Sequence, residues 1–305
     1  MEIIQPYSGS LYLKCSKMQL ISYLSHIEVP VELLFYNALE SSDEIFHNIV
    51  IECKSRYQYR SKILNDEDLA ALGIKLHYEN VDKLVDAEEI IIKMLDKFKA
   101  VFLPLDQFYF PHRLFYNKEH IFHSFIITNH ITQGNENFFF LTDFDPNFSD
   151  YVKNSLVMQA LTHLRFPVQF VSYEFKSEEI SKNEIYRKYS ETFDKHKDSY
   201  ELYSWIISVL ENDMKEETLK SIDHSLAILS GSRFLFSKYI SLLKGHENLA
   251  HQLIKISKDA EVIKNLILKY RITNLLKKQK IIELVQQLQY SEQKLLVNLK
   301  STLIK

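Results

Sequence analysis

Proline is placed so unevenly that it divides the chain into two parts. All six prolines precede residue 168, and they are Pro6, Pro30, Pro104, Pro111, Pro146 and Pro167. From residue 168 to residue 305 the chain has no proline and only two glycines, Gly231 and Gly245. Because proline ends a helix and glycine weakens one, the second part can form long helices, whereas the first must contain turns. The sequence therefore predicts two differently built parts.

Length and composition indicate a folded protein with a sizeable core. The 305 residues are 46% hydrophobic and 25% charged, which suits two globular domains. The two cysteines, Cys15 and Cys53, exclude a disulfide-rich scaffold. A net charge of −3 argues against a general nucleic-acid partner.

Targeting and membrane signals are not evident in the sequence. No apolar run reaches about 18 residues, so we expect no membrane span and no membrane partner. The first residues lack a basic patch followed by an apolar stretch, so we expect no signal peptide. The sequence thus predicts a soluble, cytoplasmic protein.

Hydrophobic periodicity changes along the first part. Spacings of three and four predict helices over residues 15–27, 31–39 and 86–98. A short apolar run at 100–103, ended by Pro104, predicts a buried strand. Residues 48–80 are expected to be irregular or to form short strands and turns.

A hairpin is the clearest β signal. Residues 123–129 and 137–142 are rich in strand-forming side chains, and a polar turn containing Gly134 separates them. Residues 168–175 are expected to form a further strand. The first part therefore mixes helices with a sheet.

The second part has helical periodicity throughout. Helical segments are expected over 183–195, 200–211, 216–229, 233–243, 247–257 and 259–303, with breaks at Gly231 and Gly245. No fixed-period repeat is visible. The sequence predicts an α+β fold, with a catalytic domain over residues 1–175 and an all-α domain over residues 176–305.

Cys15 is the candidate nucleophile. It follows a turn and stands at or near the start of a helix, where the helix dipole and unpaired backbone N–H groups favour a thiolate. The same N–H groups can stabilise an oxyanion. A small, buried structural residue is the alternative interpretation of Cys15. Cys53 has no base motif beside it and is interpreted as structural.

A thiolate nucleophile needs a base and a group that orients the base. His123 begins one strand of the hairpin and Asp143 ends the next, so antiparallel pairing would bring them to one edge of the sheet. His112, His120 and His130 are alternatives to His123 as the base. Asp145 has the same strand parity as Asp143, so alternation does not separate the two acids.

A metal site and a cofactor site are not expected. His120 and His123 are three residues apart, but no cysteine or carboxylate stands at ligand spacing from them. We therefore expect neither metal nor cofactor ligands, and the aromatic side chains are expected to fill cores or to line a groove.

Three runs carry a resemblance to a known family. They are Leu105-Asp-Gln-Phe-Tyr-Phe-Pro-His-Arg, Glu119-His-Ile-Phe-His-Ser-Phe-Ile-Ile-Thr and Phe140-Leu-Thr-Asp-Phe-Asp-Pro. They resemble the central block of the butirosin-pathway acyltransferase family, whose members have a papain-like N-terminal domain followed by a helical domain. The match covers roughly residues 10–175, and the helical part matches in architecture alone.

The resemblance implies an amide-forming acyltransferase of antibiotic biosynthesis, related to the transglutaminase-like enzymes of closthioamide-type and other nonribosomal-peptide pathways. It assigns Cys15 as nucleophile, His123 as base and acid, and Asp143 as the orienting group. The acyl group would arrive on the phosphopantetheine of an acyl or peptidyl carrier protein and pass to a small amine, such as a diamine. No other cofactor is implied.

One position departs from the papain-like pattern. Such peptidases carry an oxyanion-stabilising glutamine about six residues before the cysteine, where this chain has Gly9, and Gln5 is out of register. This departure weakens the alternative of a cysteine peptidase or amidase more than it weakens acyl transfer, because a thioester is already activated. A non-catalytic ligand-binding protein is the other alternative.

The end of the chain is basic. From residue 264 onward it has nine Lys or Arg and two Glu. Lys277, Lys278 and Lys280 could meet an acidic carrier protein, or they could simply form a solvated helix face.

Overall fold

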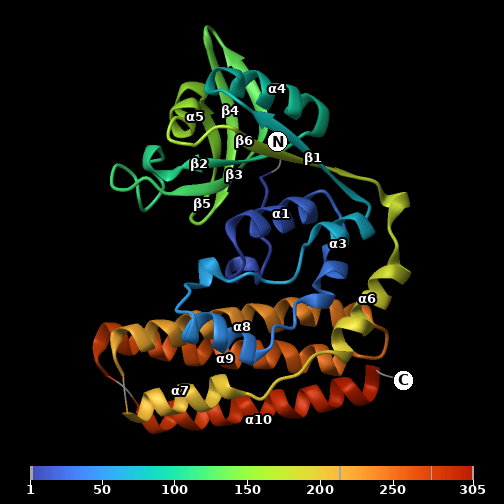
Figure 1. The fold of residues 1–305 in the computed structure, drawn as a ribbon, viewed down its shortest axis with the longest axis vertical. Coiled ribbons are helices and arrows are strands. Elements are labelled where there is room, and N and C mark those ends of the chain that lie inside the picture. The colour runs from blue at the N-terminus through green and yellow to red at the C-terminus, as the bar shows by residue number, and fades with distance from the viewer. Residues whose placement is uncertain (1–2, 213, 276, 304–305) are drawn as a thin grey trace. The chain divides into compact units, whose positions relative to one another are not determined.

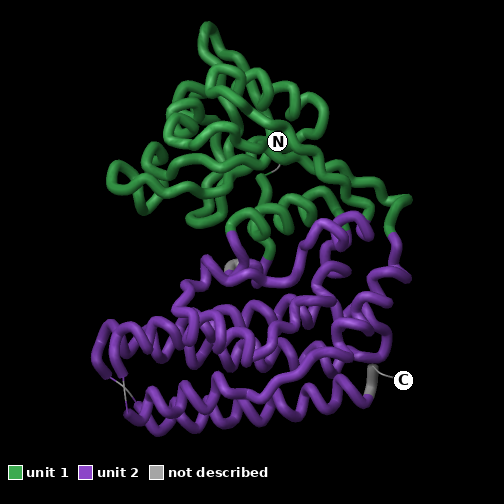
Figure 2. The backbone as a smooth tube through the Cα atoms, viewed as in Figure 1, with its two compact units in different colours: residues 1–7, 15–29, 73–180 green, residues 8–14, 30–72, 181–305 purple. Residues whose placement is uncertain are grey.

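The computed structural model describes residues 3–212, 214–275 and 277–303 (Figure 1). The chain forms two compact units, each built from segments distant in sequence (Figure 2). Unit 1 consists of residues 1–7, 15–29 and 73–180, and unit 2 consists of residues 8–14, 30–72 and 181–305. The expected α+β class is confirmed by a six-stranded sheet and a helical C-terminal region.

Unit 1 contains one antiparallel sheet with the strand order β1-β6-β2-β3-β4-β5. The strands are β1 (Ile74–Val81), β2 (Val101–Asp106), β3 (Phe122–Gln133), β4 (Glu136–Phe144), β5 (Asn147–Lys153) and β6 (Val168–Phe175). The predicted hairpin is confirmed as β3 and β4, joined at a tight turn in which Gly134 has a positive φ of 62°. The predicted strand over residues 168–175 is confirmed as β6.

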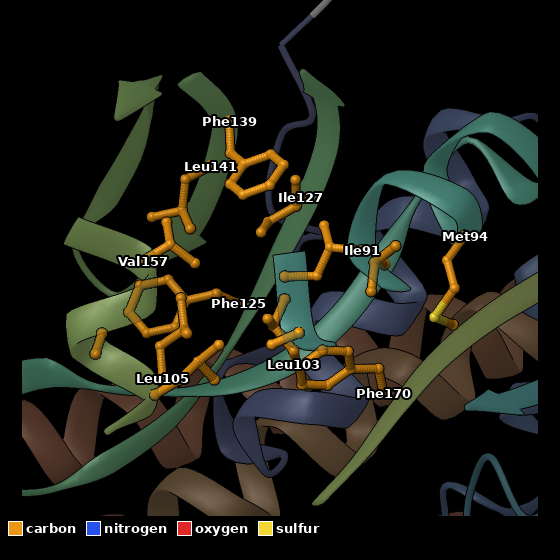
Figure 3. Packing of buried hydrophobic residues seen from close by; sticks show 14 of the residues in the cluster. Ile91, Met94, Leu103, Leu105, Phe125, Ile127, Phe139, Leu141, Val157 and Phe170 are labelled. Atoms are coloured by element: carbon orange, nitrogen blue, oxygen red, sulfur yellow. The ribbon is translucent and has the colours of Figure 1, made fainter. Parts of the chain in front are cut away.

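Two helices, α4 (Ala87–Phe98) and α5 (Asn154–Leu161), cover one face of this sheet (Figures 1 and 3). Alternate residues of the strands point to that face and are buried there with both helices. The core residues include Ile91, Met94, Leu103, Leu105, Phe125, Ile127, Phe139, Leu141, Val157 and Phe170. Each large apolar side chain buried in this way contributes about 1.5–3 kcal/mol.

Helix α1 (Cys15–His26) packs on strands β2 and β3, where it contacts strand side chains that do not belong to this core cluster. Phe102, whose parity is opposite to that of Leu103, makes an edge-to-face contact with Tyr23 at a centroid distance of 5.4 Å. The buried Gln19 side chain donates from Nε2 to the carbonyl oxygen of Ser124 in β3. The first contact fixes α1 against β2, and the second fixes it against the beginning of β3.

Two expectations for unit 1 were wrong or incomplete. Strand β2 was expected to end at Pro104, but it continues through this residue, which pairs with Ser124 of β3. Pro104 has no N–H to donate, but β2 pairs with β6 only at Phe102, so no hydrogen bond to β6 is lost at Pro104. Strand β5 and helix α5 were not expected, since their short patterns lie between stronger signals.

Unit 2 is mostly helical. Its main helices are α6 (Lys182–Asp194), α7 (Glu201–Asn212), α8 (Glu216–Leu242), α9 (Glu247–Thr273) and α10 (Lys278–Leu303). Shorter elements come from earlier in the chain: η1 (Ser10–Tyr12), η2 (Val31–Asn37), α2 (Ser42–Phe46), η3 (His47–Ile51), η4 (Arg56–Gln58) and α3 (Asp66–Ala71). The predicted helix over 31–39 is instead the 3₁₀ turn η2.

The predicted break at Gly231 was wrong, because Gly231 lies inside the continuous helix α8. A Cβ atom at this position would lie 2.2 Å from Cδ1 of Tyr12. The glycine thus lets the Tyr12 ring pack directly on the helix backbone. The predicted break at residue 258 was also wrong, since α9 runs to Thr273.

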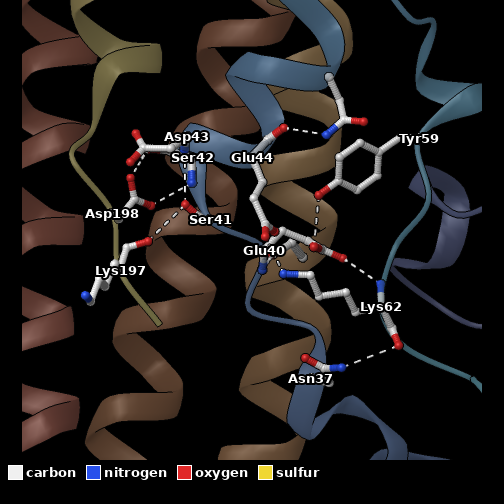
Figure 4. A network of polar contacts seen from close by, with 12 residues as sticks. Asn37, Glu40, Ser41, Ser42, Asp43, Glu44, Tyr59, Lys62, Lys197 and Asp198 are labelled. Carbon is white, nitrogen blue, oxygen red and sulfur yellow. Dashed lines mark hydrogen bonds and ion pairs between the residues drawn. The ribbon is translucent and has the colours of Figure 1, made fainter. Parts of the chain in front are cut away.

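Polar contacts explain why residues 30–72 belong to unit 2 (Figure 4). The backbone N–H of Ser42 donates to Asp198 Oδ2 at 2.6 Å, and the Ser42 hydroxyl donates to Oδ1 at 2.6 Å. The buried Glu40 carboxylate accepts from the Tyr59 hydroxyl at 2.9 Å and from the Lys62 N–H at 3.3 Å. These contacts join a segment from the first part of the chain to one from the second part. The expected domain boundary between residues 175 and 176 stays a prediction.

A buried ion pair crosses unit 2. Arg233 of α8 donates two hydrogen bonds to the carboxylate of Glu292 in α10, from Nε to Oε1 at 2.5 Å and from Nη2 to Oε2 at 2.8 Å. Arg233 Nη1 also donates to the carbonyl oxygen of Glu40 at 2.5 Å, and the Tyr203 hydroxyl donates to Glu292 at 2.8 Å. Losing one partner of such a pair would leave a buried charge uncompensated.

Among the described residues, no helix has the length and apolar character needed to cross a lipid bilayer.

Candidate active site

The candidate nucleophile lies in unit 1 at the first position of helix α1. Cys15 is half-buried, and its sulfur is in contact with the backbone amides of Ser16 and Ser124 and with the side chain of His123. Helix N-termini concentrate unpaired N–H groups, which favour negative charge. The position expected from the sequence, at the start of a helix, is confirmed.

His123 and Asp143 meet as the hairpin geometry predicted. His123 is the second residue of β3, Asp143 is the penultimate residue of β4, and His123 Nε2 lies 3.0 Å from Asp143 Oδ1. An ionised carboxylate only accepts hydrogen bonds, so Nε2 carries the proton and Nδ1 is left to face the thiol. The structure therefore brings Cys15, His123 and Asp143 together in one chain of hydrogen bonds.

Asp143 is held by more groups than the sequence indicated. Its side chain is fully buried, and Oδ2 accepts from Arg113 Nη1 at 2.9 Å and from His112 Nε2 at 3.3 Å. Its Oδ1 also accepts the backbone N–H of Phe144 at 2.8 Å. Arg113 is fixed in turn by its Nε, which donates to Gln107 Oε1 at 2.9 Å. The carboxylate is thus locked in position and electrically compensated.

These neighbours set the charge of Asp143. Burial raises the pKa of its carboxyl, but hydrogen bonds from His112 and His123 and the charges of His123 and Arg113 outweigh burial and hold the pKa well below its usual range. Asp143 is therefore an anion at neutral pH and can stabilise an imidazolium at His123.

The pKa values of His123 and Cys15 shift in opposite directions. Burial lowers the pKa of the His123 imidazole, but its hydrogen bonds to Asp143 and Cys15 raise the pKa to about 9. Burial raises the pKa of the Cys15 thiol, but the hydrogen bond and charge of His123, together with the Ser124 and Ser16 amides, lower it below its usual value. Both shifts favour a thiolate–imidazolium pair over a neutral pair.

The alternative residues lie elsewhere or play other parts. Asp145 is exposed, so Asp143 is the acid that contacts His123. His120 binds Asp106, with Nδ1–Oδ2 at 2.6 Å, and His130 lies 3.4 Å from Asp96. The suggested pairing of His120 with His123 is therefore not formed, because each ring binds a different carboxylate. Cys53 is exposed in unit 2, and its thiol lies 3.5 Å from the Val50 carbonyl.

Sequence reasoning missed Arg113 and gave His112 only as an alternative base. Both residues lie in the loop between β2 and β3, where the sequence has no periodicity from which their contacts could be predicted. The available signal was a histidine next to an arginine between a strand end and His123, but which carboxylate they meet is decided by tertiary packing.

A cavity of about 690 Å³ lies beside this network in unit 1. Its walls include His112, Phe110, Phe148, Tyr151 and Leu156. The His112 ring stacks on Phe148 at a centroid distance of 3.9 Å, so one side chain borders the cavity and contacts Asp143. A cavity of about 720 Å³ in unit 2 includes none of Cys15, His123 and Asp143.

The chain is similar to a known transferase. The chain is 28% identical to a transferase of Niallia circulans over an alignment of 236 residues, and the match covers 75% of this chain and 76% of the relative. That protein is named ribostamycin:4-(γ-L-glutamylamino)-(S)-2-hydroxybutanoyl-[BtrI acyl-carrier protein] 4-(γ-L-glutamylamino)-(S)-2-hydroxybutanoate transferase. No family model matches the chain. The chain is thus similar to an enzyme that transfers an acyl group from an acyl-carrier protein.

Proposed function

We propose that the protein is an amide-forming acyltransferase that moves an acyl group from a carrier-protein thioester, through an acyl-enzyme on Cys15, to an amine. The observation that carries this proposal is the chain of hydrogen bonds from Cys15 through His123 to Asp143. The similarity to a transferase that uses a carrier-bound acyl group supports the donor. A cysteine at the start of a helix packed on an antiparallel sheet also supports a papain-like fold for unit 1.

In the first half-reaction the Cys15 thiolate attacks the carbonyl carbon of the donor thioester. The carbon–sulfur bond to phosphopantetheine breaks, and the leaving sulfur takes the proton from Nδ1 of the His123 imidazolium. The products are a Cys15 thioester, a neutral His123 and a free carrier thiol. Asp143 holds the ring in the required tautomer throughout.

In the second half-reaction a neutral amine attacks the Cys15 thioester. His123 Nδ1 accepts the proton that the nitrogen loses, the bond to the Cys15 sulfur breaks, and the thiolate–imidazolium pair is restored. The amide leaves as product. The N–H groups at the start of α1 are suited to stabilise the oxyanion of both tetrahedral intermediates. Water must be excluded for the amine to compete, which requires a covered site.

The partners of this proposal are a carrier protein and a small amine acceptor, such as the diamine of a closthioamide-type pathway. Lys277 and Lys280 are exposed and could meet an acidic carrier, but Lys278 donates to the Glu211 carbonyl at 2.8 Å and so helps to join α10 to α7. Reversing the charge of Lys277 and Lys280 should raise the KM for the carrier without lowering kcat if this surface docks it.

The decisive experiment is intact-protein mass spectrometry after incubation with an acylated carrier protein. We expect one acyl adduct on the wild-type chain and on the Cys53→Ser variant, and none on the Cys15→Ser variant. A Cys15→Ser protein that still forms amide would overturn the proposal.

Addition of an amine then separates acyl transfer from hydrolysis. We expect the adduct to disappear with formation of amide, at a rate that depends on amine concentration. Hydrolysis that no amine diverts would instead indicate a cysteine peptidase or amidase. A Cys15 that neither acylates nor reacts faster than Cys53 with iodoacetamide would indicate a non-catalytic binding protein.

A further inference from the structure

A second cluster of ionisable side chains in unit 1 lies outside the candidate active site. It comprises Asp106, His120 and His163, whose ligand-type atoms all lie within 4.8 Å of one another. His120 Nδ1 is 2.6 Å from Asp106 Oδ2, and His163 Nδ1 is 3.8 Å from the same oxygen. Both rings thus present the same nitrogen to one carboxylate oxygen.

The three residues come from separate segments of unit 1. Asp106 ends β2, His120 lies just before β3, and His163 follows α5. Their convergence is therefore a product of the fold, and the spacing in sequence conceals it. This explains why the sequence, in which no carboxylate stands near His120 at ligand spacing, indicated no such site.

Asp106 is preorganised to receive a cation. Its side chain is fully buried, and Oδ1 is held by the backbone N–H of Phe108 at 3.0 Å, which leaves Oδ2 directed at the histidines. The imidazoles are about half exposed, so the site can be reached from solvent. The Tyr109 hydroxyl lies 3.2 Å from His163 Nδ1 and adds a further polar group.

The ring orientations are also favourable. His120 stacks on Phe108 at a centroid distance of 4.3 Å, and the two imidazoles lie 4.2 Å apart. Around a tetrahedral zinc ion the donor atoms are about 3.3 Å apart, since each bond is about 2.0–2.1 Å long. The observed spacing of 2.6 Å and 3.8 Å brackets this value, and small rotations of the half-exposed rings would equalise it.

We propose that Asp106, His120 and His163 form a binding site for a divalent transition-metal ion of the zinc class. Two imidazoles and one carboxylate are a ligand set suited to such ions, and they leave one coordination position for water. Calcium and magnesium prefer sites made of oxygen ligands, so two imidazoles disfavour them.

Occupation of this site would act on the candidate active site from outside it. A metal would tie together the two ends of the loop between β2 and β3, because Asp106 and His120 bracket that loop. The same loop carries His112 and Arg113, which hold Asp143. The bound ion would thus be a structural clamp on the groups that position the carboxylate, and the acyl-transfer chemistry itself would not pass through it.

The test is binding of Co²⁺, a spectroscopic substitute for zinc, to the full-length protein in which both cysteines are replaced by serine. This background removes the thiolate ligands that could otherwise bind the metal near Cys15. We expect one equivalent of Co²⁺ to bind with the strong visible absorption of a four-coordinate site, and zinc to displace it. Because absorption reports the binding, the result does not depend on acyl transfer.

Three variants in that background decide the assignment. Asp106→Asn, His120→Gln and His163→Gln should each weaken Co²⁺ binding by more than about a hundredfold, beyond the usual effect of losing a supporting group. His130→Gln is the matched control, since His130 also lies beside one carboxylate, at 3.4 Å from Asp96, and it should leave the affinity unchanged. His163→Gln, in a half-exposed turn, should fold normally, which circular dichroism would check.

Zinc should also raise the unfolding temperature of the parent protein and should not raise that of the His163→Gln variant. Weak absorption typical of six-coordinate cobalt, or affinity that the three variants leave unchanged, would overturn the proposal. In that case Asp106 and His120 form only a hydrogen bond.

Discussion

His123 Nε2 lies 3.0 Å from Oδ1 of Asp143, and the same carboxylate receives Arg113 Nη1 at 2.9 Å on its other oxygen. The imidazole is therefore aligned by an anion that is itself fixed by a buried cation. This arrangement restricts the rotation of the ring and specifies which nitrogen faces Cys15.

Replacing Asp143 by Asn should slow acylation of Cys15 by about 10²–10⁴-fold, because the neutral amide neither stabilises the imidazolium nor enforces the tautomer. The rate would be measured in single turnover with a small acyl-phosphopantetheine thioester. Asp145→Asn is the matched control and should react at the wild-type rate, since Asp145 is exposed. Equal losses in both variants would argue against the assigned role of Asp143.

Alkylation of Cys15 should persist to lower pH than alkylation of an ordinary thiol. Because its pKa is lowered, the thiolate should remain populated below the ordinary thiol pKa of about 8.5. In His123→Ala the hydrogen bond and charge are lost while burial remains, so the midpoint of the pH–rate profile should move to higher pH. Iodoacetamide labelling of the Cys53→Ser protein measures the profile, and a midpoint that His123→Ala does not move would contradict the pairing.

Replacing Arg113 by Met should lower the free energy of unfolding by about 3–5 kcal/mol, because Asp143 would lose its buried cationic partner. Urea unfolding would measure this. Arg187→Met is the matched control: its partner Glu191 is exposed at helical spacing, and the loss should be about 0.3–0.5 kcal/mol. Similar losses in the two variants would show that Asp143 does not depend on Arg113 for its charge balance.

Gly231→Ala should destabilise the protein by about 1–3 kcal/mol, because the new methyl group would overlap the Tyr12 ring. In a Tyr12→Ala background the ring is absent, and the same substitution should become neutral or should stabilise helix α8 by up to about 1 kcal/mol. The double-mutant cycle measures the coupling. Additive effects would show that Tyr12 and Gly231 are not in contact.

The sequence predicted correctly those features that depend on the local pattern of a single helix, strand or hairpin. The start of α1 at Cys15, the hairpin that carries His123 and Asp143, and the strand β6 all follow from periodicity and turn chemistry. The preference for Asp143 over Asp145 could not be read in this way, because both have the same parity and only burial distinguishes them.

The errors share a physical cause, which is that tertiary packing overrides a local preference. Gly231 looks like a helix end until Tyr12, more than two hundred residues earlier, is placed against it. Arg113 and His163 likewise gain their significance from partners on other segments. Such tertiary contacts could not be predicted from the local pattern of this one sequence.

The pairing of Arg233 with Glu292 has a consequence for how the chain folds as it is synthesised. Arg233 and Glu40, which it contacts through a backbone carbonyl, leave the ribosome well before Glu292. Until α10 is translated, the buried Arg233 guanidinium lacks its carboxylate partner, so the segment over residues 30–72, which Arg233 contacts at Glu40, completes its packing only afterwards. Unit 2 therefore completes its buried polar network only after α10 is translated.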